Sequence, residues 1–270
     1  MTKVIYLIIA SDNPEHQIDE SAQKKTWANS ERDNCIWLRG GSTNTFDCEK
    51  HQLIVQVKDD YEHILEKTIK GISWCLKNLD FEYLVRANVS SYFRVDLIRR
   101  EFKKWHNNKS KFGGNFDFIN DNTKTLRERM FINGGAIFLN QRACEELVDL
   151  NPEDFRGVPD DYAISHFLMR RDITPQHVRR GNLALTSIFS LRPYYRLKSS
   201  NLSSMASNRM YALHRLFRET TIINKFLAFV MLHLLELKYF KQVHGNVCNY
   251  VLGVYSILSN KIHMLVIRTK

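Results

Sequence analysis

The sequence predicts an α/β protein built on an open, mostly parallel sheet that is flanked by helices, with a helical appendage at the carboxyl end. In the amino-terminal part, four short apolar runs alternate with helix-like stretches, as they do in βαβ units. After Thr220 the pattern changes to two long apolar stretches that are interrupted by single cationic residues. We therefore expect two domains, residues 1–200 and residues 201–270.

The apolar runs predict the strands. Each run is rich in Val, Ile, Leu and aromatic residues, and polar segments separate the runs. The expected strands are residues 3–10, 34–40, 51–57 and 81–88. The last of these is expected to run through a tight polar turn directly into a helix.

The stretches between the strands predict helices, because their apolar residues recur at spacings of three and four. These helices are expected to begin at Ser21, Tyr61 and Val95. Gly71 would let the second helix approach the sheet closely. Residues 106–129 are polar and contain two adjacent glycines, which predicts an irregular surface section.

The carboxyl-terminal stretches allow two interpretations. Neither reaches the roughly 20 uninterrupted apolar residues that a membrane-spanning helix needs. They form either helices packed as an appendage or helices that lie in a membrane interface with their cations extended to the headgroups. Peripheral membrane contact through this segment is therefore one expectation.

The basic residues are concentrated in the carboxyl-terminal part. The net charge is +10, and residues 170–270 hold 16 Lys and Arg against 3 Asp and Glu, compared with 23 against 26 in residues 1–169. Such an excess suits anionic lipid, nucleic acid or a phosphorylated substrate. The sequence lacks the aromatic and Gly-rich signatures of RNA-binding modules, so we expect no nucleic-acid partner.

The cysteines favour a cytoplasmic protein. There are five, an odd number, and none has the C-x-x-C spacing of a zinc site or a redox pair. The first apolar run, of about seven residues, is short for a signal peptide and no cleavage site follows it. We expect reduced thiols and a cytoplasmic location, with peripheral membrane contact as the alternative.

Several motifs resemble, in type and order, those of the β1,3-galactosyltransferase and fringe glycosyltransferases. That family's pattern D-x-Y-x-N-L-x-x-K-T-x-x-G-x-x-W is met by Asp59, Tyr61, Lys67, Thr68, Gly71 and Trp74, with His63 and Ile64 at its Asn and Leu positions. The other matching segments are ESAQKKTWANS, WLRGGS, YLVRANVSSYF, FINGGAIFLN and VPDDYAISHFL. The resemblance spans residues 3–175.

The resemblance implies a GT-A fold and an inverting hexosyl- or pentosyltransferase that uses a nucleotide sugar, with UDP-sugars favoured. It implies a glycan or a lipid-linked glycan as acceptor. The expected lack of disulfides and of a secretory anchor departs from the Golgi members of that family, so we expect a bacterial or large-virus source. Asp161, or failing that Asp160, would be the general base, and Gly134 and Gly135 would lie at the acceptor. On its own, however, a Pro-Asp-Asp segment is also a common helix start.

The segment that would hold a metal ion departs from the family. Where the family has an acidic motif, this chain has Asn88 and Ser90, whose neutral oxygens supply little affinity for Mg²⁺ or Mn²⁺. We therefore expect metal-independent transfer without a cofactor, with cations stabilising the leaving diphosphate. The predicted donor-binding residues are Ser11, Lys24, Arg39, Arg86, Asn88, Ser90, Arg196, Lys198 and His214.

Two other functions remain open. One is a non-catalytic module that binds a sugar or a nucleotide, which the loss of the acidic motif would suit. The other is a metal-dependent transferase that recruits carboxylates from elsewhere, such as Asp96, Asp117 or Asp121. For Asn88 and Ser90 a turn or capping role is the alternative to donor binding.

Overall fold

The computed structural model describes residues 3–29, 31–105, 111–121, 123–178, 180–187, 190–193 and 207–211. The chain divides into two compact units, one of Met1–Arg180 with Met205–Arg209 and one of Gly181–Ser204 with Met210–Lys270. The two units are described separately below. The predicted domain boundary at residue 200 stays a prediction.

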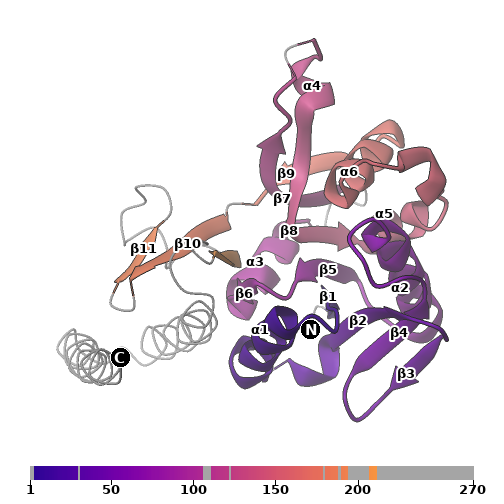
Figure 1. Cartoon of the computed structure of the whole chain (residues 1–270). Helices are drawn as coiled ribbons and strands as arrows, with labels where there is room; N and C mark the ends of the chain where they lie inside the picture. Colours follow the sequence, from indigo (N-terminus) through magenta and orange to yellow (C-terminus); the bar gives the residue numbers. More distant parts are fainter. Residues whose placement is uncertain are drawn as a thin grey trace, which may run out of the picture. The chain divides into compact units, whose positions relative to one another are not determined.

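The first unit contains an eight-stranded sheet within the described residues. Its strands are β1 (Val4–Ile9), β2 (Cys35–Gly41), β3 (Thr45–Asp47), β4 (Gln52–Gln56), β5 (Tyr83–Asn88), β7 (Lys111–Phe118), β8 (Met130–Asn140) and β9 (Thr174–His177). The strand order is β3-β4-β2-β1-β5-β8-β7-β9 (Figure 1). The strands β4, β2, β1 and β5 pair in parallel, and β8 is antiparallel to both of its neighbours. The predicted α/β class with a mostly parallel sheet is confirmed, as are the four predicted strands.

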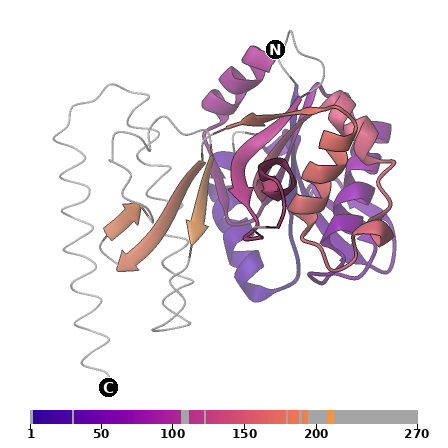
Figure 2. The same cartoon turned by 90° about the horizontal axis from the view of Figure 1, so that it is seen from above.

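Helices cover both faces of this sheet (Figure 2). The helices of the unit are α1 (Pro14–Lys25), α2 (Ile64–Asn78), α3 (Val95–Trp105), α4 (Leu126–Arg129), α5 (Gln141–Leu147) and α6 (Asp160–Arg170), with 3-10 turns at Trp27–Asn29, Arg32–Asn34 and Pro152–Phe155. The helices α2, α5 and α6 contact one another. They cover the face that carries Leu7 of β1, whereas Tyr6 faces the opposite side and packs on Trp27 with 5.4 Å between ring centres. Every residue of β1 is buried, as expected for an interior parallel strand.

Gly71 lets α2 lie close to the sheet, as predicted. A Cβ atom at this position would lie 2.5 Å from Leu38 Cδ2 and 3.2 Å from Leu7 Cδ2. Both leucines are fully buried, so the surrounding core has little room to move.

We expect Gly71→Val to lower the free energy of unfolding by about 2 kcal/mol, because it overfills this contact. Urea unfolding measures the change. The matched control is Lys77→Val, which places the same side chain at an exposed position of α2. A loss in Gly71→Val no larger than that in Lys77→Val would show that packing against Leu38 does not determine the cost.

Three sequence-based expectations need correction. Residues 106–129 are not an irregular section, since they include β7, which lies between β8 and β9 in the sheet. The first helix begins at Pro14 rather than Ser21, and Pro is favoured in the first turn. After Asn88 the chain forms β6 (Ser91–Phe93), which pairs with β12 (Ser207–Tyr211), before the helix at Val95. The errors at β7 and β6 have one cause, because pairing with a distant segment leaves no local pattern.

The second unit contains a strand pair in its described part. The strands β10 (Arg180–Ser187) and β11 (Ser190–Pro193) are antiparallel, with Leu183 opposite Pro193. No helix within the described residues is long and apolar enough to cross a membrane. The predicted carboxyl-terminal helices lie outside the described residues.

Candidate functional site

The carboxyl ends of β1 and β5 meet at a point where the chain connections diverge. β2 follows β1 in the chain and lies on one side of it, whereas β5 lies on the other side and is reached through β4 and α2 (Figure 1). In open α/β sheets, ligands bind at the carboxyl edge at such a switch point. Because Ile9 is in register with Asn88, the segments that follow β1 and β5 leave the sheet side by side. The predicted residues Ser11, Arg39 and Arg86 lie at this same edge.

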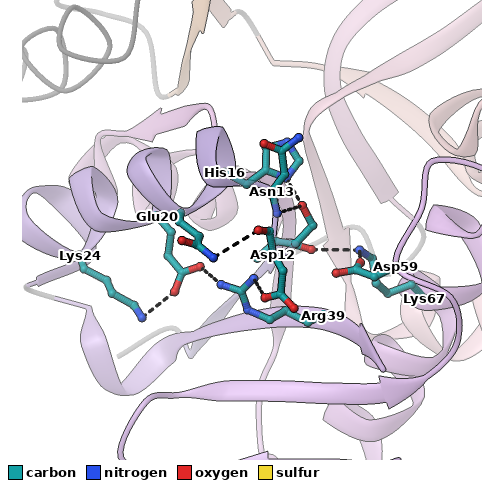
Figure 3. Close-up of polar contacts among 11 residues, drawn as sticks. Asp12, Asn13, His16, Glu20, Lys24, Arg39, Asp59 and Lys67 are labelled. Atoms are coloured by element: carbon teal, nitrogen blue, oxygen red, sulfur yellow. Dashed lines mark hydrogen bonds and ion pairs between the residues drawn. The ribbon is translucent and has the colours of Figure 1, made fainter. Parts of the chain in front are cut away.

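Arg39 links the end of β2 to helix α1 (Figure 3). Its NH1 group donates to Asp12 Oδ1 at 2.9 Å, and its NH2 group donates to Glu20 Oε2. The side chains of Arg39 and Glu20 are buried, whereas that of Asp12 is 86% exposed. Exposed ion pairs contribute little free energy, so an anionic ligand could replace Asp12 at Arg39 at small cost.

Lys24 shares Glu20 with Arg39. Lys24 Nζ donates to Glu20 Oε1 at 2.7 Å (Figure 3). It also lies 4.4 Å from the centre of the Trp37 ring. Two predicted donor-binding cations are thus held by one carboxylate that was not among the predicted site residues. The signal for Glu20 was its place four residues before Lys24 on a helix.

Ser11 is oriented by the start of α1. Its Oγ lies 2.6 Å from His16 Nδ1 and accepts the Asn13 N–H at 3.3 Å (Figure 3). Ser11 is a predicted site residue and His16 is not. The pair places a hydroxyl and an imidazole immediately after β1.

Lys67 extends from α2 to the same edge of the sheet. Its Nζ donates to the Ala10 carbonyl at 3.0 Å and to Asp59 Oδ1 at 2.5 Å (Figure 3). Burial lowers the pKa of Lys67, the Asp59 carboxylate raises it, and the charges of Arg86 and Arg39 lower it further. Arg86 and Arg39 therefore both lie within electrostatic reach of Lys67. Lys67 filled a family motif but was not predicted as a site residue, and its position on the buried face of α2 was the available signal.

Arg86 is almost completely buried at the end of β5, with 1% of its side chain exposed. Its NH1 group donates to Asn88 Oδ1 at 2.8 Å and to the Gly134 carbonyl at 2.5 Å, and its NH2 group donates to Asp160 Oδ2 at 2.5 Å. Both terminal nitrogens therefore serve protein acceptors. In this arrangement the Arg86 charge would act on an anionic ligand at this edge through its electric field.

Asn88 and Ser90, which were predicted to stand in place of an acidic metal motif, lie at and just after the end of β5. Asn88 Oδ1 accepts a hydrogen bond from Arg86, so a metal ion bound to that oxygen would lie next to a guanidinium. Ser90 lies in the turn between β5 and β6. Within the part of the chain that the structure describes, no three His, Cys, Asp or Glu side chains group as metal ligands would.

Asp160 and Asp161 are the first two residues of α6, where the helix dipole favours carboxylates. Asp161 Oδ2 accepts the Gly134 N–H at 2.8 Å, and Asp160 pairs with Arg86. Burial, and then the neighbouring Asp160 carboxylate, raise the pKa of Asp161, while the Gly134 N–H and Arg86 oppose the rise. A carboxylate with a raised pKa is a stronger base, which suits proton abstraction.

Gly134 and Gly135, the predicted acceptor residues, lie in β8 opposite the end of β5. Both are buried, and their peptide groups bond within the protein. The Gly135 carbonyl accepts from Ser91 Oγ, and its N–H donates to Asn133 Oδ1 at 3.0 Å. The Gly134 N–H of this strand therefore holds the Asp161 carboxylate of α6. The predicted donor-binding residues Arg196, Lys198 and His214 lie outside the described residues.

No protein-family model and no curated protein sequence matches the chain. Solved structures of glycosyltransferases do resemble it. A glycosyltransferase involved in glycosylation of the major capsid of PBCV-1 is 8% identical over 83% of this chain and 99% of that chain, with a TM-score of 0.47. The galactosyltransferase LgtC, in complex with donor and acceptor sugar analogs, is 11% identical over 83% of this chain and 95% of that chain, with a TM-score of 0.45. The mannosyltransferase PcManGT from Pyrobaculum calidifontis, in complex with GDP-Man and Mn²⁺, is 9% identical over 65% of this chain and 54% of that chain, with a TM-score of 0.41.

Proposed function

We propose that the chain is an inverting glycosyltransferase that moves a sugar from a nucleotide diphosphate, in the first instance a UDP-sugar, to a hydroxyl of a glycan or a lipid-linked acceptor. The observation that carries the proposal is the gathering of Arg39, Lys67 and Arg86 with the Asp160–Asp161 pair at the carboxyl edge of the sheet. Residues of the motifs that resemble β1,3-galactosyltransferase and fringe enzymes, among them Lys67, Arg86 and Asp161, lie at this edge and support the same function.

In this geometry the residues on the α1 side of the edge would bind the donor, and those on the α6 side would take the proton of the acceptor. On the α1 side, Lys24 is partly exposed and the buried Arg39 pairs with the exposed Asp12, so a diphosphate that displaced Asp12 would accept from Arg39. The buried charges of Lys67 and Arg86 add positive potential behind them. Together these groups would stabilise the negative charge that develops on the departing nucleotide diphosphate.

On the α6 side, Asp161 would act as the general base. It would take the proton from the acceptor hydroxyl as the acceptor oxygen attacks the anomeric carbon and the bond to the diphosphate breaks. The bonding electrons leave with the nucleotide diphosphate, and a single displacement inverts the anomeric carbon. Asp160 suits this role less well, because its Oδ2 already accepts from Arg86.

Metal independence is part of the proposal. It is supported by the Asn88–Arg86 hydrogen bond at the position where the family binds its metal ion. The carboxylates considered as relocated ligands have other contacts: Asp96 lies 3.7 Å from Arg94 NH2, Asp117 accepts from Asn133 and Asp121 accepts from Thr123.

The test is a panel of nucleotide sugars, assayed for thermal stabilisation and for sugar release, with EDTA and with added Mn²⁺. We expect UDP-sugars to bind and to turn over at a rate that EDTA does not change, because cationic side chains replace the metal ion. Turnover that EDTA abolishes and Mn²⁺ restores would favour a metal-dependent transferase. Binding without turnover for every sugar and acceptor would favour a non-catalytic binding module.

A further inference from the structure

The backbone of Gly134 connects two side chains that are far apart in the sequence. Its N–H donates to Asp161 Oδ2 at 2.8 Å, and its carbonyl accepts from Arg86 NH1 at 2.5 Å. A Cβ atom at Gly134 would lie 3.1 Å from Arg86 NH1 and 3.1 Å from Asp161 Oδ2, so the two side chains flank this residue closely. The N–H and the carbonyl belong to the two peptide groups on either side of the Gly134 Cα, so Arg86 fixes the position of the backbone from which the N–H holds Asp161.

Asp160 keeps Arg86 in the orientation in which its NH1 group reaches the Gly134 carbonyl. The Arg86 side chain is 1% exposed and that of Asp160 is 13% exposed. A buried guanidinium without a carboxylate partner is strongly destabilising, so Asp160 is what allows an arginine at this position. Asn88 Oδ1 accepts from NH1 at 2.8 Å, which directs that nitrogen toward Gly134.

We propose that the Arg86–Asp160 ion pair positions the general base: Arg86 fixes the backbone at Gly134, whose N–H orients the Asp161 carboxylate, and Asp160 holds Arg86 in place. The inference rests on the proposed function, because a fixed Asp161 carboxylate matters when it takes a proton from an acceptor. Neither member of the pair touches the reacting atoms, so both are positioning residues.

The two members of the pair shift the pKa of Asp161 in opposite directions. Burial raises the pKa of Asp161 most and Asp160, its neighbour on α6, also raises it. Arg86 of β5 lowers this pKa, as do the N–H groups of Gly134 in β8 and Tyr162 in α6. Loss of the Asp160 charge should therefore move the titration of Asp161 to lower pH, and loss of the Arg86 charge should move it to higher pH.

The experiment measures this titration in the full-length protein by NMR, with carbon-13 in the aspartate carboxyl groups. The Asp161 signal is assigned by its loss in Asp161→Asn. We expect Asp160→Asn to lower the pH of the Asp161 transition and Arg86→Met to raise it. The matched control is Asp80→Asn, which removes an 84% exposed carboxylate just before β5, at the opposite edge of the sheet, and should leave the transition unmoved.

Turnover separates positioning from a purely structural role. Asp160→Asn keeps an acceptor for Arg86 but removes its ion-pair partner, so we expect kcat to fall about tenfold. Arg86→Met removes the donor to Gly134, so we expect kcat to fall about a hundredfold, while KM for the donor sugar, which senses the Arg86 charge only through its electric field, should rise by a smaller factor. Arg86→Lys, which keeps the charge and one donor, should recover part of the loss.

If Arg86→Met fails to fold, the double variant Arg86→Met/Asp160→Asn removes both charges together and should still lose kcat, because the hydrogen bond to Gly134 is gone. Wild-type kcat in a folded Arg86→Met or double variant, or Asp161 shifts in the same direction for both single variants, would overturn the inference. If the wild type releases no sugar from any donor, the proposed function fails, while the titration still decides whether the pair acts on Asp161.

Discussion

Asp161→Asn is expected to keep the fold and nucleotide binding and to lower turnover by roughly a hundredfold or more, as loss of a general base does. Asparagine has nearly the same shape, and its Oδ1 can still accept the Gly134 N–H that now bonds to the carboxylate at 2.8 Å. What it lacks is the ability to take the proton of the acceptor hydroxyl. The measurement is kcat with a UDP-sugar, together with a binding assay for UDP.

The role of Asp161 as a base also predicts the direction in which the rate changes with pH. Burial and Asp160 raise the pKa of Asp161, and the base works when it is deprotonated. The value of kcat/KM should therefore rise with pH through a transition that lies above the ordinary range of an aspartate. Asp154→Asn, at an exposed position just before α6, is the control and should keep both the rate and this transition. Near-normal turnover in Asp161→Asn would remove Asp161 from the mechanism.

Lys67→Met is expected to lower the free energy of unfolding by about 3 kcal/mol. It removes the ammonium that now bonds to the Ala10 carbonyl and to Asp59, and it leaves that carboxylate, 19% exposed, without its buried partner. Because Ala10 precedes Ser11 and Asp12, the same change should loosen the loop after β1 and weaken UDP binding. Urea unfolding and a UDP-binding assay measure the two effects.

Two further variants isolate the cause. Lys70→Met, on the same helix, replaces a lysine that is 42% exposed, so we expect a change within about 0.5 kcal/mol. The double variant Lys67→Met/Asp59→Asn removes both charges and should recover part of the lost stability. If Lys67→Met costs no more than Lys70→Met, the buried pair does not hold this edge of the sheet.

The order of strands and the place of the site show what the amino-acid sequence determined by itself. Apolar runs predicted β1, β2, β4 and β5, because an interior parallel strand is buried on both faces and its side chains are apolar almost throughout. The carboxyl ends of parallel strands share one edge, so Ser11, Arg39 and Arg86 could be placed together before any contact was known. The close approach of α2 to the sheet at Gly71 could also be predicted, because a glycine in the sequence means that no Cβ separates the helix from the strands.

The partners of these residues were decided by the tertiary structure alone. Arg86 bonds to Asp160, 74 positions further along the chain, and Lys67 bonds to the Ala10 carbonyl, 57 positions earlier. The strand β7 is likewise a strand through its pairing with β8 and β9, although its own composition resembles a loop. Local periodicity reports which face of an element is buried, but it carries no information about which distant polar group will meet a buried charge. That choice is made when the chain packs, because each buried cation must find an acceptor among the groups that the fold brings within hydrogen-bonding distance.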